Sequence, residues 1–158
     1  MISKIKKLWN KYKRLLLYIF VALAAGFIDN LLAGGTEIYE QINTPSFAPP
    51  GFLFPIVWSI LYILMGIGAY LISKEENNSK ALKLYYTQLV VNSLWSILFF
   101  RFKLFAVSTL WLVLLIVLVS FMTYEFYKMN KKAALIQVPY ILWIVFAFVL
   151  NYSIYLLN

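Results

Sequence analysis

The sequence predicts an all-α membrane protein, a single domain that crosses the bilayer about five times as a helix bundle. Of its 158 residues, 63% are hydrophobic and 13% are charged, whereas a soluble domain carries about 25% charged residues. A helix needs about 20 residues to span roughly 30 Å of hydrocarbon. Segments of that length and apolarity lie near residues 15–34, 53–73, 82–100, 104–127 and 134–157.

The first span follows a basic N-terminal segment, which contains Lys4, Lys6, Lys7, Lys11, Lys13 and Arg14. Such a segment also begins a secretory signal peptide, but the apolar run Leu15–Leu32 is long, and no convincing cleavage site precedes a soluble domain. We therefore interpret this run as a membrane span.

A polar, Pro-rich loop over residues 35–52 separates the first two spans. Pro45, Pro49 and Pro50 exclude a regular helix there. We call this segment the lid loop, because it is the one connection long enough to cover an end of the bundle. The later links, near 74–81, 101–103 and 128–133, are short, so consecutive helices are expected to be antiparallel neighbours.

Basic residues predict the orientation of the bundle, because cytoplasmic loops retain Lys and Arg. All 14 of them except Arg101 and Lys103 fall on the side of the N-terminus. We expect the N-terminus to be cytoplasmic, with the lid loop and the C-terminus outside.

The composition excludes several kinds of chemistry. Cysteine and histidine are absent, which removes disulfides, thiolate nucleophiles, imidazole metal ligation and histidine acid–base catalysis. No Ser–His–Asp set, phosphate-binding glycine loop or paired carboxylates are found. We expect no metal, no cofactor and no nucleic-acid partner.

Three predicted helices carry what we call the aromatic stripes, in which Trp or Tyr alternates with amides and small residues. Spacings of three and four residues place the members of each stripe on one helix face. The stripes are Trp58, Tyr62, Met65 and Ala69; Gln88, Asn92, Trp95 and Phe99; and Tyr140, Trp143, Ala147, Leu150 and Asn151.

Two interpretations of the aromatic stripes remain open. Helix packing explains them through amide bonds across membrane helices, each about 0.6–2 kcal/mol, and through interfacial belts of Trp and Tyr. However, Trp143 and Asn151 lie two turns apart, so one belt cannot hold both. A groove of flat rings, with a small Ala147 leaving room, suits a large planar apolar ligand.

Two acids lie in or beside the apolar segments. Asp29, near the end of the first span, is a functional candidate because ionisable groups inside a membrane are costly. The alternative is that Asp29 is hydrated at the outer interface. Glu125 lies near Lys128 and is expected to pair with the basic residues there.

Three groups of residues resemble the motifs of a known family and cover residues 45 to 151. They are Pro45-Ser46-Phe47-Ala48-Pro49-Pro50 with Trp58, Leu61-Tyr62 and Met65-Gly66; Gln88-Leu89 with Asn92, Trp95 and Phe99-Phe100; and Pro139-Tyr140 with Trp143, Phe146-Ala147 and Leu150-Asn151. In order and spacing the chain resembles the TspO/MBR family, which includes translocator protein (peripheral benzodiazepine receptor) and the tryptophan-rich sensory proteins.

This resemblance implies a five-helix bundle, usually a homodimer, with a cavity closed by the first loop. It implies binding of porphyrins such as protoporphyrin IX and haem, and of sterols or benzodiazepine-site ligands in some members. The implied lining is Trp58, Tyr62, Asn92, Trp95, Trp143 and Ala147, with Leu150 and Asn151 nearby; Tyr140 joins it from its aromatic stripe.

The chain departs from the family pattern at three places. Phe52 stands where the family tends to have Trp, and Pro55-Ile56 stands where it has Gly-Pro. The family's sterol-recognition pattern lacks its basic residue here, because Ser153 follows Tyr152. High-affinity sterol binding through that element is not expected.

Together these observations predict a receptor or carrier for porphyrins and similar planar apolar ligands in a bacterial inner membrane. Three alternatives stay open. The first is an enzyme that degrades porphyrin in light, with Trp58 and Trp143 as reactive groups. The second is a small transporter with Asp29 as relay, and the third is an assembly or stress protein without a ligand. We expect binding rather than catalysis.

Overall fold

The computed structural model describes residues 2–35 and 37–158. Every regular element in these two ranges is a helix, which confirms the predicted all-α class. The elements are α1 (Ile2–Ala33), η1 (Glu37–Glu40), α2 (Leu53–Ile72), α3 (Ser79–Ser96), η2 (Ile97–Arg101), α4 (Phe105–Met129), α5 (Lys131–Leu135) and α6 (Val138–Leu157).

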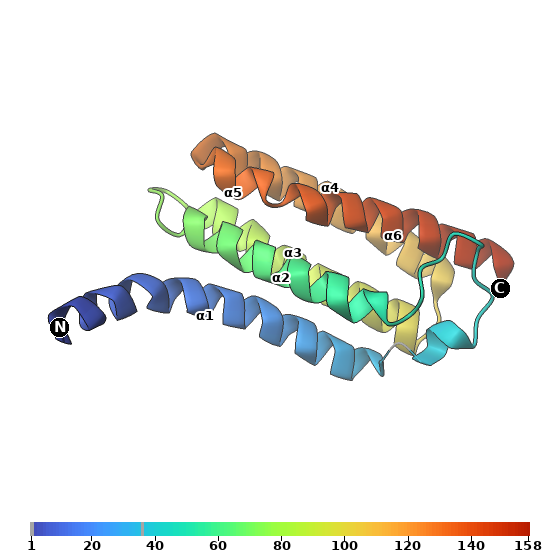
Figure 1. The fold of residues 1–158 in the computed structure, drawn as a ribbon. Coiled ribbons are helices and arrows are strands. Elements are labelled where there is room, and N and C mark those ends of the chain that lie inside the picture. Colours follow the sequence, from blue (N-terminus) through green and yellow to red (C-terminus); the bar gives the residue numbers. More distant parts are fainter. Residues whose placement is uncertain (1, 36) are drawn as a thin grey trace.

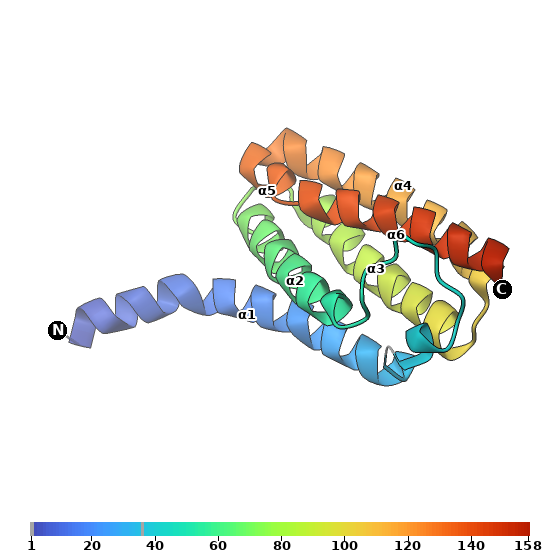
Figure 2. The same cartoon turned by 45° about the vertical axis from the view of Figure 1, so that its right-hand side comes forward.

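Five long helices, α1, α2, α3, α4 and α6, lie side by side in the bundle (Figure 1). The helix α1 packs along α2, and its N-terminal part extends away from the other helices (Figure 2). The lid loop and the C-terminus lie together at one end of the bundle. This arrangement confirms the predicted five-helix bundle.

Four helical segments of the described chain are long and apolar enough to cross a membrane: Lys4–Ala33, Leu53–Ile72, Phe105–Met129 and Lys131–Leu157. The helix α3 is more polar than these four, because it carries Lys80, Lys83, Gln88 and Asn92. Both amides are buried among the other helices. The two amides of α3 therefore face the interior of the bundle, whereas Lys80 and Lys83 are exposed near its N-terminal end.

The observed helix bounds differ from the expected ones at both ends of the chain. The helix α1 begins at Ile2 rather than near residue 15, because the basic segment consists largely of good helix formers. Near the C-terminus, the short α5 precedes α6, which begins at Val138 with Pro139 in its first turn. Proline fits that position because the first helical N–H groups have no intrahelical partner.

A glycine allows α1 and α2 to approach closely. A Cβ atom added to Gly66 would lie 2.7 Å from the Cα atom of Ile19. The backbones therefore touch at this point, and any side chain at position 66 would push α1 away.

Two polar contacts hold the lid end of the bundle together. The Arg101 guanidinium in η2 donates to the Leu32 carbonyl near the end of α1, at 3.1 Å. The lid loop is tied to α6, because the Asn43 N–H donates to Asn158 Oδ1 at 3.0 Å and Asn158 Nδ2 donates to the Asn43 carbonyl at 2.9 Å.

Candidate functional site

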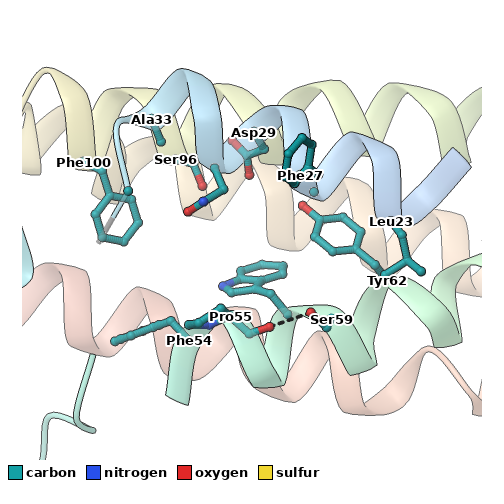
Figure 3. A pocket seen from close by; sticks show the side chains of 14 residues that line it. Leu23, Phe27, Asp29, Ala33, Phe54, Pro55, Ser59, Tyr62, Ser96 and Phe100 are labelled. Atoms are coloured by element: carbon teal, nitrogen blue, oxygen red, sulfur yellow. Dashed lines mark hydrogen bonds between the residues drawn. The ribbon is translucent and has the colours of Figure 1, made fainter. Parts of the chain in front are cut away.

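A cavity of about 340 Å³ lies between α1, α2 and the junction of α3 with η2. We call it the main cavity. Its lining residues are Leu23, Gly26, Phe27, Asp29, Asn30, Ala33, Gly35, Phe54, Pro55, Trp58, Ser59, Tyr62, Ser96 and Phe100. Figure 3 shows Asp29 and Ser96 on one side of the cavity and Phe54, Pro55 and Ser59 on the opposite side.

The main cavity has a buried floor and an exposed mouth. Tyr62 and Ser96 are buried, whereas Phe27 on α1 and Ser59 on α2 are exposed at the surface of the bundle. The mouth therefore opens sideways between these two helices.

Polar groups are concentrated on the α1 side of the floor. Asp29 is buried, and its Oδ1 atom has no hydrogen-bond partner among the described residues. The hydroxyl groups of Ser96 and Tyr62 lie within hydrogen-bonding reach of the Asp29 carboxylate. The Tyr62 oxygen in turn accepts from Asn92 Nδ2 at 2.9 Å. This short network joins α1, α2 and α3 at the cavity.

The interpretation of Asp29 as a hydrated interfacial residue does not fit this burial. Glu125, in contrast, behaves as predicted, because it pairs with Lys80 and Lys128 at 2.8 Å each. These are the ion pairs found in the described part of the chain, so Asp29 takes part in none of them.

Aromatic rings connect the main cavity to the interior of the bundle. The ring centroid of Trp58 lies 5.8 Å from that of Tyr62, 6.0 Å from that of Trp95 and 6.2 Å from that of Tyr140. Such tilted and edge-to-face pairs contribute about 0.5–1.5 kcal/mol each beyond their buried area. The contacts fix the Trp58 ring at the wall of the cavity.

The sequence-predicted binding residues fall into three groups. Trp58 and Tyr62 line the main cavity. Asn92, Tyr140 and Trp143 line no cavity described here. The remaining four line a second space, which we call the inner gap, together with Tyr39, Phe54, Phe99 and Phe100; these four are Trp95, Ala147, Leu150 and Asn151.

The inner gap measures about 10 Å³, about the minimum space that one water molecule needs. Phe54 and Phe100 line both the inner gap and the main cavity. These two rings therefore form the partition between them.

Several amides of the aromatic stripes bond across helices, as the packing interpretation requires. Trp95 Nε1 donates to Asn151 Oδ1 at 3.0 Å, and the Tyr140 hydroxyl donates to Gln88 Oε1 at 2.8 Å. These groups are thus already paired with one another. Trp143 Nε1, in contrast, is buried without a partner among the described residues.

The lid loop lies over the α6 side of the bundle. Phe47 packs edge-on against Phe146, with centroids 6.4 Å apart, and Tyr39 packs against Phe54 at 4.9 Å. Pro45 and Pro49 are half-buried and Pro50 is exposed. Of the described residues of the loop, Gly35 alone lines the main cavity, so the loop covers the inner gap rather than the mouth.

Sequence reasoning singled out Asp29 but missed the rest of the α1 lining, although a signal for it exists. Ala22, Gly26, Asp29 and Ala33 are spaced by four, three and four residues, which places small side chains and the acid on one helix face. All but Ala22 line the main cavity. Ser96 was also missed; it follows Asn92 by four residues and extends that stripe.

The comparisons with known proteins agree with this architecture. The model of the TspO/MBR family matches residues 16–157. Tryptophan-rich protein TspO of Archaeoglobus fulgidus is 35% identical over 92% of this chain and 97% of its own length. Protein CrtK of Rhodobacter capsulatus is 36% identical over 88% of this chain and 89% of its own length. Human translocator protein is 32% identical over 77% of this chain and 75% of its own length. The chain is therefore an integral, multi-pass membrane protein that belongs to the TspO/MBR family.

Proposed function

We propose that the protein is a membrane receptor or carrier that binds porphyrins and similar planar apolar ligands in the main cavity. The observation that carries this proposal is the cavity itself, which is walled by the rings of Phe27, Phe54, Trp58, Tyr62 and Phe100. Flat rings offer a planar ligand large contact area at a low cost in side-chain entropy.

The size of the main cavity constrains how such a ligand binds. Its volume of about 340 Å³ is at the lower end of the roughly 300–1,000 Å³ typical of small-molecule sites. A few fused rings fit inside. A whole porphyrin is too large for this volume. One edge of the macrocycle would enter the main cavity, and the opposite edge would stay in the mouth between α1 and α2, in contact with lipid.

The inner gap supplies further room if the partition opens. Rotation of Phe54 or Phe100 would join it to the main cavity and add Trp95, Ala147 and Leu150 to the lining. The ligand would then reach the residues that the family resemblance implies. For the degradation alternative, Trp58 lines the main cavity, but Trp143 lines neither the main cavity nor the inner gap. The Trp143 ring centroid lies 6.1 Å from that of Phe54.

The setting of the protein is part of the proposal. The distribution of basic residues supports a cytoplasmic N-terminus and an external lid loop in a bacterial cell membrane. A homodimer is the proposed assembly, by analogy with the family. Relatives named translocator protein and tryptophan-rich sensory protein are compatible with a carrier or a receptor.

Titration with protoporphyrin IX, followed by tryptophan quenching in detergent, tests the proposal. Ser59→Phe narrows the mouth at an exposed position and is expected to weaken binding about tenfold. Ile60→Phe is the matched control, because Ile60 is also exposed on α2 but does not line the cavity. Unsaturable quenching, or equal affinity in all three proteins, would mean that porphyrin merely partitions into the micelle.

A further inference from the structure

We infer that the main cavity selects ligands that carry a protonated nitrogen or an N–H donor, which Asp29 receives at its unpartnered Oδ1 atom. This inference rests on the proposed function and names the chemical class of ligand that the same cavity prefers. It concerns a residue of α1 that lies outside the aromatic stripes.

The placement of Asp29 is the first observation. The residue is 6% exposed, lines the main cavity, and leaves Oδ1 without a hydrogen-bond partner among the described residues. A buried carboxylate without a partner is costly in apolar surroundings. A ligand that donates a hydrogen bond to Oδ1 offsets this cost, and its positive charge would add to the gain.

The neighbours of Asp29 orient it without neutralising it. The Tyr62 oxygen already accepts from Asn92, so its own hydroxyl proton is free to point at the Asp29 carboxylate. Ser96 offers a second hydroxyl. The two hydroxyl groups orient the Asp29 carboxylate by hydrogen bonding and carry no positive charge.

Arg101, which bonds to α1 close to Asp29 in the sequence, makes no ion pair with it. The Arg101 guanidinium donates to the Leu32 carbonyl at 3.1 Å, and the described ion pairs are made by Glu125 alone. The Asp29 carboxyl therefore has no cation paired with it among the described residues, in a protein whose net charge is +8. Long-range attraction favours anions, so a preference for cations would have to come from the cavity.

The inference also predicts how a porphyrin lies. Its carboxylates would be repelled by Asp29 and would point toward the mouth, whereas its pyrrole edge enters the floor. A compact aromatic amine would make more of the available contacts, since its rings would pack against the aromatic walls and its nitrogen would reach the Asp29 carboxylate.

Three probes of the same tricyclic shape test this selection: 9-aminoacridine (cation), acridine (neutral) and acridine-9-carboxylate (anion). Binding is measured by probe anisotropy with the full chain in nanodiscs of zwitterionic lipid. We expect the wild type to bind the cation about tenfold more tightly than the neutral probe. Asp29→Asn should bring the ratio of cation affinity to neutral-probe affinity to about one, whereas Asp29→Glu should retain the preference for the cation.

Glu76→Gln, which removes a carboxylate from the exposed α2–α3 loop, is the matched control and should retain the preference. Persistence of the preference for the cation in Asp29→Asn would overturn the inference. Equal affinity of the wild type for the cation and the anion would also overturn it, and this result does not depend on whether a variant folds. Saturable binding of all three probes without charge preference refutes the inference but leaves the proposed function standing. Absence of saturable binding by any probe also refutes the inference, and the protoporphyrin IX titration then decides whether the proposed function stands.

Discussion

Asn151 illustrates how single polar side chains organise the interior of this bundle. Its amide accepts from Trp95 Nε1 and from the Ser108 hydroxyl, and it donates to Thr109 Oγ1 and to the Phe105 carbonyl, all within 3.0 Å. One side chain of α6 thereby ties α3 and α4 together. An amide with all of its groups paired in a dry interior is a structural element as much as a ligand contact.

Replacement of this amide is expected to destabilise the protein. Asn151→Leu leaves the buried Trp95 indole N–H without its acceptor, whereas the Ser108 hydroxyl keeps the Phe105 carbonyl. The free energy of unfolding should fall by about 1–3 kcal/mol. Thermal unfolding in detergent measures the change. Ser153→Ala is the control, because the Ser153 hydroxyl bonds only within its own helix. Equal stability of Asn151→Leu and wild type would contradict this role.

Spacing in the sequence predicted which residues face inward, but not which residues meet. Tyr62, Asn92, Trp95 and Asn151 are all buried, as their stripes indicated. Their pairing depends on the relative height and rotation of separate helices, which no single-helix pattern contains. The polarity of Asp29 drew attention to it, whereas its burial follows only from the packing of α1 on its neighbours.

At the scale of elements, the contact between α1 and α2 controls the main cavity, because both helices supply its walls. Gly66→Ala places a methyl group against the Ile19 backbone, which cannot rotate away. We expect a loss of about 1–3 kcal/mol in unfolding free energy and weaker protoporphyrin binding.

Gly51→Ala serves as the control for this substitution, because its Cβ would lie 3.7 Å from Tyr39, an ordinary contact. The two measurements are detergent unfolding and ligand titration. If Gly66→Ala matched Gly51→Ala in both, close approach of α1 to α2 would be irrelevant to the cavity.

The lid loop is held by a side chain from a distant part of the sequence. Asn158→Ala removes both hydrogen bonds to Asn43, and amide exchange in residues 41–48 should accelerate about tenfold. Asn78→Ala is the control, because the Asn78 side chain lies at the other end of the bundle and bonds only to the Glu75 carbonyl. This substitution should leave the exchange in residues 41–48 unchanged. Unchanged exchange in Asn158→Ala would show that the remaining contacts hold the loop without this tie; they include the Asn43 Nδ2 bond to the Leu157 carbonyl and the packing of Phe47.

The prolines predicted that the lid loop is irregular, yet its position could not be predicted. Pro45, Pro49 and Pro50 exclude helix locally, whereas the Asn43–Asn158 tie joins residues 115 positions apart. The bounds of α1 were missed for a related reason, because a hydropathy pattern marks the apolar span and not the helix that continues beyond it.

At the scale of the whole molecule, the proposed orientation is directly testable, because the chain contains no cysteine. Ser46→Cys in the lid loop and Glu76→Cys in the α2–α3 loop are both exposed positions. A membrane-impermeant maleimide should label Ser46→Cys in intact cells and Glu76→Cys only after permeabilisation. The reverse labelling pattern would show that the N-terminus lies outside and the lid loop inside the cell.

The proposed site of the planar ligand is the main cavity, between α1 and α2. The most direct measurement is a crystal structure with zinc protoporphyrin, in which anomalous scattering locates the zinc atom. We predict a single peak at the mouth between Phe27 and Ser59, with the macrocycle edge against Trp58. A peak beside Ala147 with the main cavity empty, or peaks scattered over the lipid-facing surface, would contradict the claim.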